Sequence, residues 1–264
     1  MAKILAWDLE TSHLNANGGF IICASIVDVE KPTKIYRSLR IDDYKGWQKD
    51  PWHDRDLVLD LVDDLSGADT WITYYGKRFD VPFLNTRILY WRSRGVRVDH
   101  LENVPHIDLY DTAKRRLRLH SNRLQSVSDL LGNGDKTPLE LPVWLKAAGG
   151  HKKSIDYVDK HCQEDARILA KNYIALRPLV VAHPHLGLLA GTKDSCPVCG
   201  GSEIQSRGIY VTQASRRRRL FCRSCGKWSS IPYREPKLDN NNKIRRIKGG
   251  RTNRNTPQVR KPVG

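Results

Sequence analysis

Long apolar runs are missing from this sequence of 264 residues, and their absence excludes several classes of protein. No stretch approaches the roughly 20 consecutive apolar residues of a transmembrane helix, so we expect no membrane contact. The opening residues Met1-Ala2-Lys3 lack the apolar region of a signal peptide and lead directly into a predicted strand. The sequence therefore predicts a cytoplasmic protein.

Acidic residues are also scarce: 29 Asp and Glu face 45 Lys and Arg, which gives a net charge of +16 and a pI near 9.7. A chain this basic is expected to bind a polyanion, and nucleic acid is the first candidate. A basic surface without such a ligand is the alternative. Residues 231–264 hold half of the excess charge, with ten basic residues against two acidic ones, and show no apolar pattern. We expect them to form a disordered basic tail.

Cysteines are few, and four of the six are clustered. Cys23 and Cys162 stand alone, whereas two Cys-x-x-Cys-Gly knuckles are separated by 22 residues and contain Cys196, Cys199, Cys222 and Cys225. Without a secretion signal, such a cluster indicates a metal site rather than disulfides. Two matched knuckles predict a zinc ribbon in which four thiolates hold one Zn²⁺; a pair of redox dithiols is the alternative.

A basic hairpin is predicted between the knuckles, with strands at residues 209–212 and 220–222. We expect its turn to hold four consecutive arginines: Arg216, Arg217, Arg218 and Arg219. Contacts to phosphates fit this charge, although a solvated turn is the alternative. Tyr210, Phe221 and Trp228 lie near enough to stack on bases, or they pack the small ribbon instead.

The first part of the chain alternates predicted strands and helices. Strands are expected at residues 4–11, 20–29 and 34–41, forming a meander, and again at 70–75 and 105–107. The first helix is expected to begin with Asp50 as N-cap and Pro51 at its first position. Its acidic residues are interpreted as a solvated face: Asp54, Asp56, Asp60, Asp63 and Asp64.

Further helices are predicted from Asp80 to Gly95, from residue 124 to Gly132, and from a Ser154 N-cap to Pro178, and Asp108 and Asp111 are interpreted as helix N-caps. Residues 139–150 are expected to be irregular. The pattern predicts an α/β fold with a mixed sheet flanked by helices. We divide the chain into a domain at residues 1–190, the ribbon at 191–230 and the tail at 231–264.

Two carboxylates stand side by side on the first predicted strand. Asp8 and Glu10 are two residues apart, so their side chains point to the same face of the sheet. Buried carboxylates need a compensating cation, and Mg²⁺ or Mn²⁺ accepts such oxygen ligands. A strand end that runs out into solvent is the alternative interpretation.

Two further acids suggest a complete site. Asp80 stands where a strand passes into a helix, and Asp165 lies on the side of its helix that faces the sheet. Four carboxylates in one pocket would repel one another unless two divalent cations bridged them. Two such ions support in-line hydrolysis of a phosphodiester bond. His161, four residues before Asp165, lies on the same helix face and could accept a proton from the attacking water, although a surface histidine is the alternative.

Three segments together resemble the exonuclease motifs of the DEDD superfamily, which has the ribonuclease H-like fold. They are Trp7-Asp8-Leu9-Glu10-Thr11, Gly76-Lys77-Arg78-Phe79-Asp80 and His161-Cys162-Gln163-Glu164-Asp165. The stretch from His106-Ile107-Asp108-Leu109 through Lys136-Thr137-Pro138 and Trp144 also resembles a phage and bacterial group of exonuclease-like proteins, in which a zinc ribbon follows the nuclease domain. The resemblance spans about residues 3–230.

The resemblance implies roles for the four acids. Asp8, Glu10 and Asp165 would hold one metal ion, and Asp8 would bridge to a second ion that Asp80 reaches. The sequence departs from the superfamily pattern at two places: Tyr75 stands where Asn is frequent, and His161 stands at the spacing usual for Tyr, with Lys160 at the spacing usual for His. We infer that His161 fills the general-base position with different chemistry.

The leading hypothesis is a 3′→5′ exonuclease dependent on two Mg²⁺ or Mn²⁺ ions, acting on single strands or 3′ ends, with DNA favoured over RNA. The exonuclease direction comes from the resemblance alone. A structure-selective endonuclease on the same fold and a non-catalytic nucleic-acid-binding protein are the alternatives. Replication or repair proteins are candidate partners.

Overall fold

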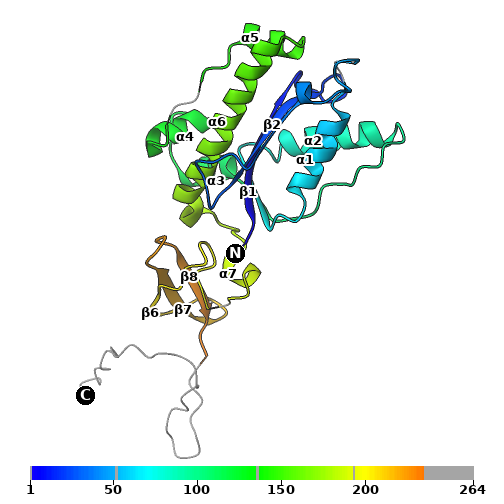
Figure 1. Cartoon of the computed structure of the whole chain (residues 1–264). Coiled ribbons are helices and arrows are strands. Elements are labelled where there is room, and N and C mark those ends of the chain that lie inside the picture. Colours follow the sequence, from blue (N-terminus) through cyan, green and yellow to red (C-terminus); the bar gives the residue numbers. More distant parts are fainter. Residues whose placement is uncertain (1, 51–52, 135–136, 193, 235–264) are drawn as a thin grey trace, which may run out of the picture.

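A five-stranded mixed sheet forms the centre of the first part of the chain (Figure 1). The structure, a computed structural model, describes residues 2–50, 53–134, 137–192 and 194–234. The strand order is β3-β2-β1-β4-β5. The strands are β1 (Ile4–Thr11), β2 (Ile21–Asp28), β3 (Arg37–Arg40), β4 (Thr70–Thr73) and β5 (His106–Asp108).

The first three strands form the predicted antiparallel meander, and β4 and β5 join it in parallel. The α/β class and the mixed sheet are therefore confirmed. β3 is shorter than the predicted strand because the chain still turns before it: Lys34 N–H donates to the Lys31 carbonyl over 2.9 Å.

Helices cover both faces of this sheet (Figure 1). The helices α1 (Arg55–Leu65) and α2 (Asp80–Arg92) lie on one side, and the long helix α6 (Lys152–Leu176) crosses β1 and β2 on the other. Three shorter helices precede α6: α3 (Leu109–Arg116), α4 (Leu124–Leu131) and α5 (Leu141–Ala148). No helix in the part of the chain that the structure describes is long and apolar enough to cross a membrane.

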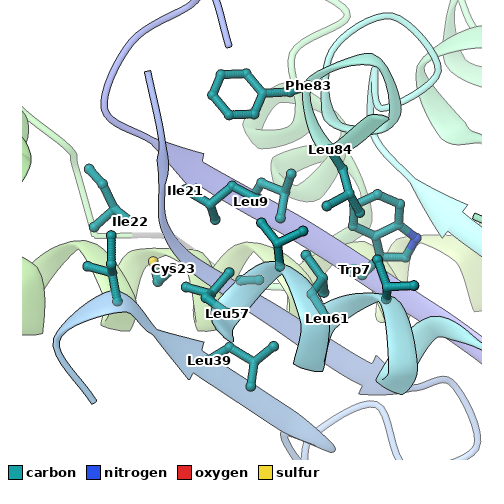
Figure 2. Close-up of a cluster of buried hydrophobic side chains, with 14 of the residues drawn as sticks. Trp7, Leu9, Ile21, Ile22, Cys23, Leu39, Leu57, Leu61, Phe83 and Leu84 are labelled. Carbon is teal, nitrogen blue, oxygen red and sulfur yellow. The ribbon is translucent and has the colours of Figure 1, made fainter. Parts of the chain in front are cut away.

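Alternation along β1 separates the two faces. Trp7 and Leu9 enter the core that α1 and α2 cover, where Leu57, Leu61 and Leu84 pack against them (Figure 2). The alternating residues Ile4 and Ala6 enter a second core with Ala166, Leu169 and Tyr173 of α6. Asp8 and Glu10 continue this second series, so the strand directs them towards α6.

The start of α1 corrects two sequence predictions. The helix begins at Arg55 rather than after Asp50, and Pro51 lies outside the described residues. Asp54 was assigned to a solvated acidic face, but it is fully buried. It accepts hydrogen bonds from the Arg87 guanidinium (2.8 and 2.6 Å), the Trp91 indole (2.7 Å) and the Ile21 backbone N–H (3.0 Å). Asp54 therefore joins α1, α2 and β2 through one charged group.

Two predictions before α6 were also wrong. Residues 139–150, expected to be irregular, contain α5, which has a proline in its first turn and ends at Gly149. The N-cap of α6 is His151 rather than Ser154; the Ser154 hydroxyl lies 2.9 Å from the His151 Nδ1 atom, inside the first turn. The apolar residues that recur at helical spacing along α6 are buried: Ile155, Val158, Cys162, Ala166, Leu169 and Tyr173.

A second, three-stranded antiparallel sheet follows the short helix α7 (Leu186–Leu189). It contains β6 (Ile204–Val211), β7 (Arg216–Cys222) and β8 (Trp228–Pro232) in that order. The predicted hairpin exists, but its four arginines lie on β7 rather than at the turn, which Thr212 and Ser215 close. β8 includes the first residues assigned to the tail, and residues 235–264 lie outside the described residues.

We predict that Asp54→Ala destabilises the fold strongly. The variant leaves the Arg87 guanidinium, which is 1% exposed, without its buried partner. Such a loss costs about 3–5 kcal/mol in the free energy of unfolding. Urea denaturation followed by far-UV circular dichroism measures it. Asp63→Ala, on the exposed side of the same helix, is the control and should change stability by less than about 0.5 kcal/mol. Equal stability of the two variants would refute a structural role for the buried pair.

Candidate active site and zinc-binding residues

The carboxylates of β1 and the polar residues of α6 face one another. Cys162 of α6 lies against β1, and its Sγ donates to the Asp8 carbonyl over 3.5 Å. His161, the neighbouring residue, places Nε2 3.8 Å from Glu10 Oε1 and 3.6 Å from Asp165 Oδ2. The structure thus brings together Glu10, His161 and Asp165 from two elements that are far apart in sequence.

The other ring nitrogen of His161 fixes how the imidazole can react. His161 is 4% exposed, and its Nδ1 is hydrogen-bonded to the Thr137 carbonyl. A carbonyl only accepts, so Nδ1 carries a hydrogen, and Nε2 is the nitrogen that holds the lone pair whenever the ring is neutral. Nε2 points towards two carboxylates. The arrangement favours a proton, a water molecule or a cation between the three groups.

A short segment between α4 and α5 holds this histidine in place. The Thr137 N–H donates to Glu164 Oε2 over 2.7 Å, while the Thr137 carbonyl accepts from His161. Burial of Glu164 opposes ionisation, but the hydrogen bonds from Thr137 and the charge of Lys160 keep its pKa below the usual value. Sequence reasoning gave Glu164 no role, and its place beside Asp165 was the only available signal.

Asp80 reaches the same strand from the opposite helix layer. β4 pairs with β1 from Ile4 to Ala6 and no further along β1. The Leu9 N–H therefore has no partner in β4, and it donates a hydrogen bond to Asp80 Oδ1 over 3.2 Å. Asp80 is 4% exposed. Burial raises the pKa of its carboxyl group to about 7, with a contribution from the nearby Asp108 charge. A cation beside Asp80 would favour the ionised form.

The donor set fits divalent cations with oxygen ligands. In the described residues, the four cysteines are the only group of three or more His, Cys, Asp and Glu whose ligand atoms all lie within 4.8 Å of one another. No three of the acids around β1 therefore converge on one point in this geometry, and their side chains would have to draw together around an ion to bind it. The roles of Asp8, Glu10, Asp80, His161 and Asp165 remain predictions.

A strained turn borders the acids. Tyr75 has φ of 69°, the one positive value at a residue other than glycine among those described. Such a conformation costs of order 1–3 kcal/mol and must be held by its surroundings. The buried Asp108 carboxylate accepts hydrogen bonds from the Tyr75 N–H (2.8 Å) and the Lys77 N–H (3.2 Å). It also caps α3 through the Tyr110 N–H, which confirms that Asp108 is an N-cap; Asp111 pairs with Arg78 instead.

The four clustered cysteines fit a zinc ribbon. Their sulfur atoms lie within 4.8 Å of one another, with 3.7 Å between Cys196 and Cys225 and 3.6 Å between Cys199 and Cys222. Four thiolates arranged tetrahedrally about 2.3 Å from a zinc ion would stand about 3.8 Å apart. Each knuckle closes on a glycine with positive φ, Gly200 at 69° and Gly226 at 75°.

Lys227 connects this ribbon to the end of α6. It follows the second knuckle directly, and its backbone carbonyl accepts from the Cys222 N–H over 2.9 Å. Its ammonium group donates to the Pro178 and Val180 carbonyls over 2.8 and 2.9 Å. Burial, with the charge of Arg116, lowers the pKa of Lys227.

The four arginines of β7 are divided between the two faces of the ribbon sheet. Arg217 lies opposite Tyr210, and Phe221 lies between Gln205 and Trp228. With Arg219, these residues define the aromatic face: Tyr210, Arg217, Arg219, Phe221 and Trp228. Arg216 and Arg218 point to the other face, where both contact the Tyr233 ring.

Comparisons with known proteins agree with this architecture. A family model described as the RNase H superfamily matches residues 5–176. Among solved structures, the chain is similar to the family B DNA polymerase from the hyperthermophilic archaeon Pyrobaculum calidifontis, with a TM-score of 0.51 and 16% sequence identity. That match covers 67% of this chain but 25% of the polymerase chain, and at this identity it shows the fold alone. No curated protein matches the sequence significantly.

We predict that the purified protein contains one zinc ion per chain and that Cys199→Ser loses it, because three thiolates bind zinc much more weakly than four. Elemental analysis measures the zinc, and the spectrum of the cobalt-substituted protein reports tetrahedral thiolate coordination. Cys23→Ala, which removes a buried cysteine of β2, should keep the zinc content unchanged. Zinc retained in Cys199→Ser at full stoichiometry would contradict the Cys₄ assignment.

Proposed function

Because the chain belongs to the RNase H superfamily, we propose that it is a metal-dependent nuclease of the DEDD type that removes nucleotides from the 3′ end of DNA. Superfamily membership supports a nuclease, and a nuclease implies a nucleic acid substrate. The observation that carries the finer proposal is the contact of α6 with β1, where His161 Nε2 stands within 4 Å of carboxylate oxygens of Glu10 and Asp165.

Two Mg²⁺ or Mn²⁺ ions are proposed to bind at the four acids. Asp8, Glu10 and Asp165 would hold one ion after their side chains draw together around it, and Asp8 and Asp80 would hold the other. When bound, such ions lower the pKa of the attacking water and neutralise charge on the leaving oxygen. The buried Asp80 supports the proposal, since its carboxyl group needs a compensating positive charge to ionise fully at neutral pH.

His161 is proposed as the general base. Thr137 fixes the tautomer with the hydrogen on Nδ1, so Nε2 is oriented to accept a proton from a water molecule held between Glu10 and Asp165. Glu164 acts on the histidine through Thr137 and is a positioning residue. This role departs from the Tyr that is usual at the same spacing in the superfamily.

DNA is the proposed substrate, supported by the structural similarity to a DNA polymerase and by the net charge of +16. The ribbon and the basic residues that follow it are proposed to bind the DNA strand whose phosphodiester bond is hydrolysed at the four acids. An endonuclease with the same acids would give internal cuts instead of progressive shortening.

We predict that Asp8→Asn and Asp165→Asn each reduce hydrolysis by about a thousandfold or more, because each removes a charge that holds a cation. The assay uses oligonucleotides labelled at the 5′ end, as DNA and as RNA, with Mg²⁺, Mn²⁺ or EDTA. The wild-type protein should give a metal-dependent ladder that shortens from the 3′ end of DNA. Asp156→Asn, on the exposed side of α6, should cut normally.

In the same assay His161→Gln should reduce kcat while the affinity for the strand stays unchanged, as loss of a base requires. Normal turnover in Asp8→Asn or Asp165→Asn would show that the acids are misassigned. Discrete internal cuts by the wild-type protein would establish the endonuclease, and full turnover by His161→Gln would exclude the histidine as the base.

We predict that the two faces of the ribbon differ in strand binding. The double variant Arg217→Ala/Arg219→Ala should weaken binding of single-stranded DNA several-fold more than Arg216→Ala/Arg218→Ala. The reason is that only the first pair shares a face with Tyr210, Phe221 and Trp228. Both variants lose the same charge, so each is the control for the other. Fluorescence anisotropy over a salt series measures the effect; equal losses would show that net charge alone binds the strand.

A further inference from the structure

Ser25 of β2 is fully buried, and among the described residues its hydroxyl oxygen has no hydrogen-bond partner. More than about nine-tenths of the buried polar groups in folded proteins are paired, because an unpaired one loses its bonds to water without replacement. The neighbours of Ser25 in the strand, Ala24 and Ile26, are apolar and equally buried. Packing alone therefore does not explain a serine at this position.

Strand pairing places Ser25 between an acid of the candidate site and a second serine. Ser25 lies directly opposite Asp8 of β1 on one side and directly opposite Ser38 of β3 on the other. Residues opposite each other on antiparallel strands point to the same face of the sheet, with Cβ atoms about 4.5–5.5 Å apart. This is the face that α6 covers, since Val27, two residues further along β2, lies in one core with Ala166. Asp8, Ser25 and Ser38 thus form one row beneath α6.

The polar groups on the β3 side of Ser25 are bonded to one another. The Ser38 hydroxyl donates to Asp159 Oδ1 over 2.6 Å, and the Gln163 side-chain amide donates to Asp159 Oδ2 over 2.8 Å. Both oxygens of this carboxylate therefore accept a hydrogen bond without Ser25. The neighbour that remains for the Ser25 hydroxyl across a strand pair is Asp8.

The backbone of Asp8 is held in place, whereas rotation about its side-chain bonds can move its carboxylate. Cys162 donates to the Asp8 carbonyl over 3.5 Å, and β1 pairs with β2 on both sides of this residue. No three acids around β1 converge on one point, so their side chains must turn to bind an ion. Carboxylates that bind a metal ion are themselves hydrogen-bonded, which fixes their orientation. A hydroxyl donor opposite Asp8 suits this requirement.

We propose that Ser25 is a positioning residue for Asp8: its hydroxyl donates a hydrogen bond to the Asp8 carboxylate when a divalent cation is bound at the acids. The inference rests on the proposed function and adds to it a residue of β2 that orients one metal-binding carboxylate. Ser25 is fully buried, so it acts on the cation only through Asp8. The same hydrogen bond gives the buried hydroxyl a partner.

Binding of Mn²⁺ to the full-length, zinc-containing protein tests the proposal without any nucleic acid. Free Mn²⁺ gives a sharp electron paramagnetic resonance signal that broadens on binding, so a titration measures the dissociation constant. Ser25→Ala removes the hydroxyl opposite Asp8. Ser38→Ala is the matched control, because it removes a hydroxyl of the same row that has its own partner, Asp159. Asp8→Asn identifies the ions bound at the acids, since these are the ions that this variant fails to bind.

We expect Ser25→Ala to bind Mn²⁺ at the acids about tenfold more weakly, the usual loss when the hydrogen-bond partner of a metal ligand is removed. Ser38→Ala should stay within about twofold of the wild-type protein. Melting temperatures measured by circular dichroism without Mn²⁺ should show the opposite order. Ser25→Ala should melt no lower than the wild-type protein, because it removes an unpaired hydroxyl, whereas Ser38→Ala should melt about 2–4 °C lower, because it breaks a hydrogen bond. A purely structural role for Ser25 does not give this reversal.

Wild-type affinity for Mn²⁺ in Ser25→Ala would overturn the assignment even if the protein degrades DNA. Equal losses of affinity in Ser25→Ala and Ser38→Ala would also overturn it, since they would indicate a general disturbance beneath α6. Conversely, a loss confined to Ser25→Ala in a protein that cuts no strand would support the positioning role and reject the nuclease. The two proposals therefore fail separately. A wild-type protein that binds no more Mn²⁺ than Asp8→Asn would reject both.

Discussion

The contact between α6 and β1 is the constraint on which the rest of the structure depends. Small residues make it close: Ala166 and Ala170 of α6 are fully buried against the sheet, and Cys162 reaches the Asp8 carbonyl. The same packing that fills the second core therefore sets the distances from His161 to Glu10 and Asp165.

Outside this contact, charged groups hold the layers in register. Asp54 joins α1, α2 and β2 on one side of the sheet, and Asp108 holds the Tyr75 turn and the start of α3 at its edge. Both carboxylates are buried and accept several hydrogen bonds, as buried charges must. They resemble catalytic acids in burial, but their partners are arginine, tryptophan and backbone N–H groups, which indicates a structural role.

The sequence predicted those features that follow from short-range periodicity. The two-residue period of β1 placed Asp8 and Glu10 on one face, and the stripe of α6 placed Asp165 towards the sheet. The sequence did not predict features that depend on a partner far along the chain. Asp54 has the sequence context of a solvated acid on an amphipathic helix, and its burial follows from its hydrogen bonds to Arg87, 33 residues away. The arginines of β7 were predicted at a turn because a run of charged residues indicates exposure to solvent. They lie on a paired strand instead, since both faces of so small a sheet are open to solvent. The strain at Tyr75 had no local signal, since its cause is Asp108.

Lys227 would connect zinc binding in the ribbon to the segment that follows α6. Its position depends on the second knuckle, and its ammonium group reaches the carbonyls that follow α6. Zinc binding, which orders the knuckle, should therefore also favour the contact of Lys227 with these carbonyls. By thermodynamic linkage, the contact favours zinc binding to the same extent. Docking against the nuclease fold should raise the zinc affinity of the ribbon above that of the isolated segment, by the free energy of the docking contact. Zinc bound in the ribbon would then also stabilise the contact between Lys227 and the segment after α6, which the ion itself does not touch.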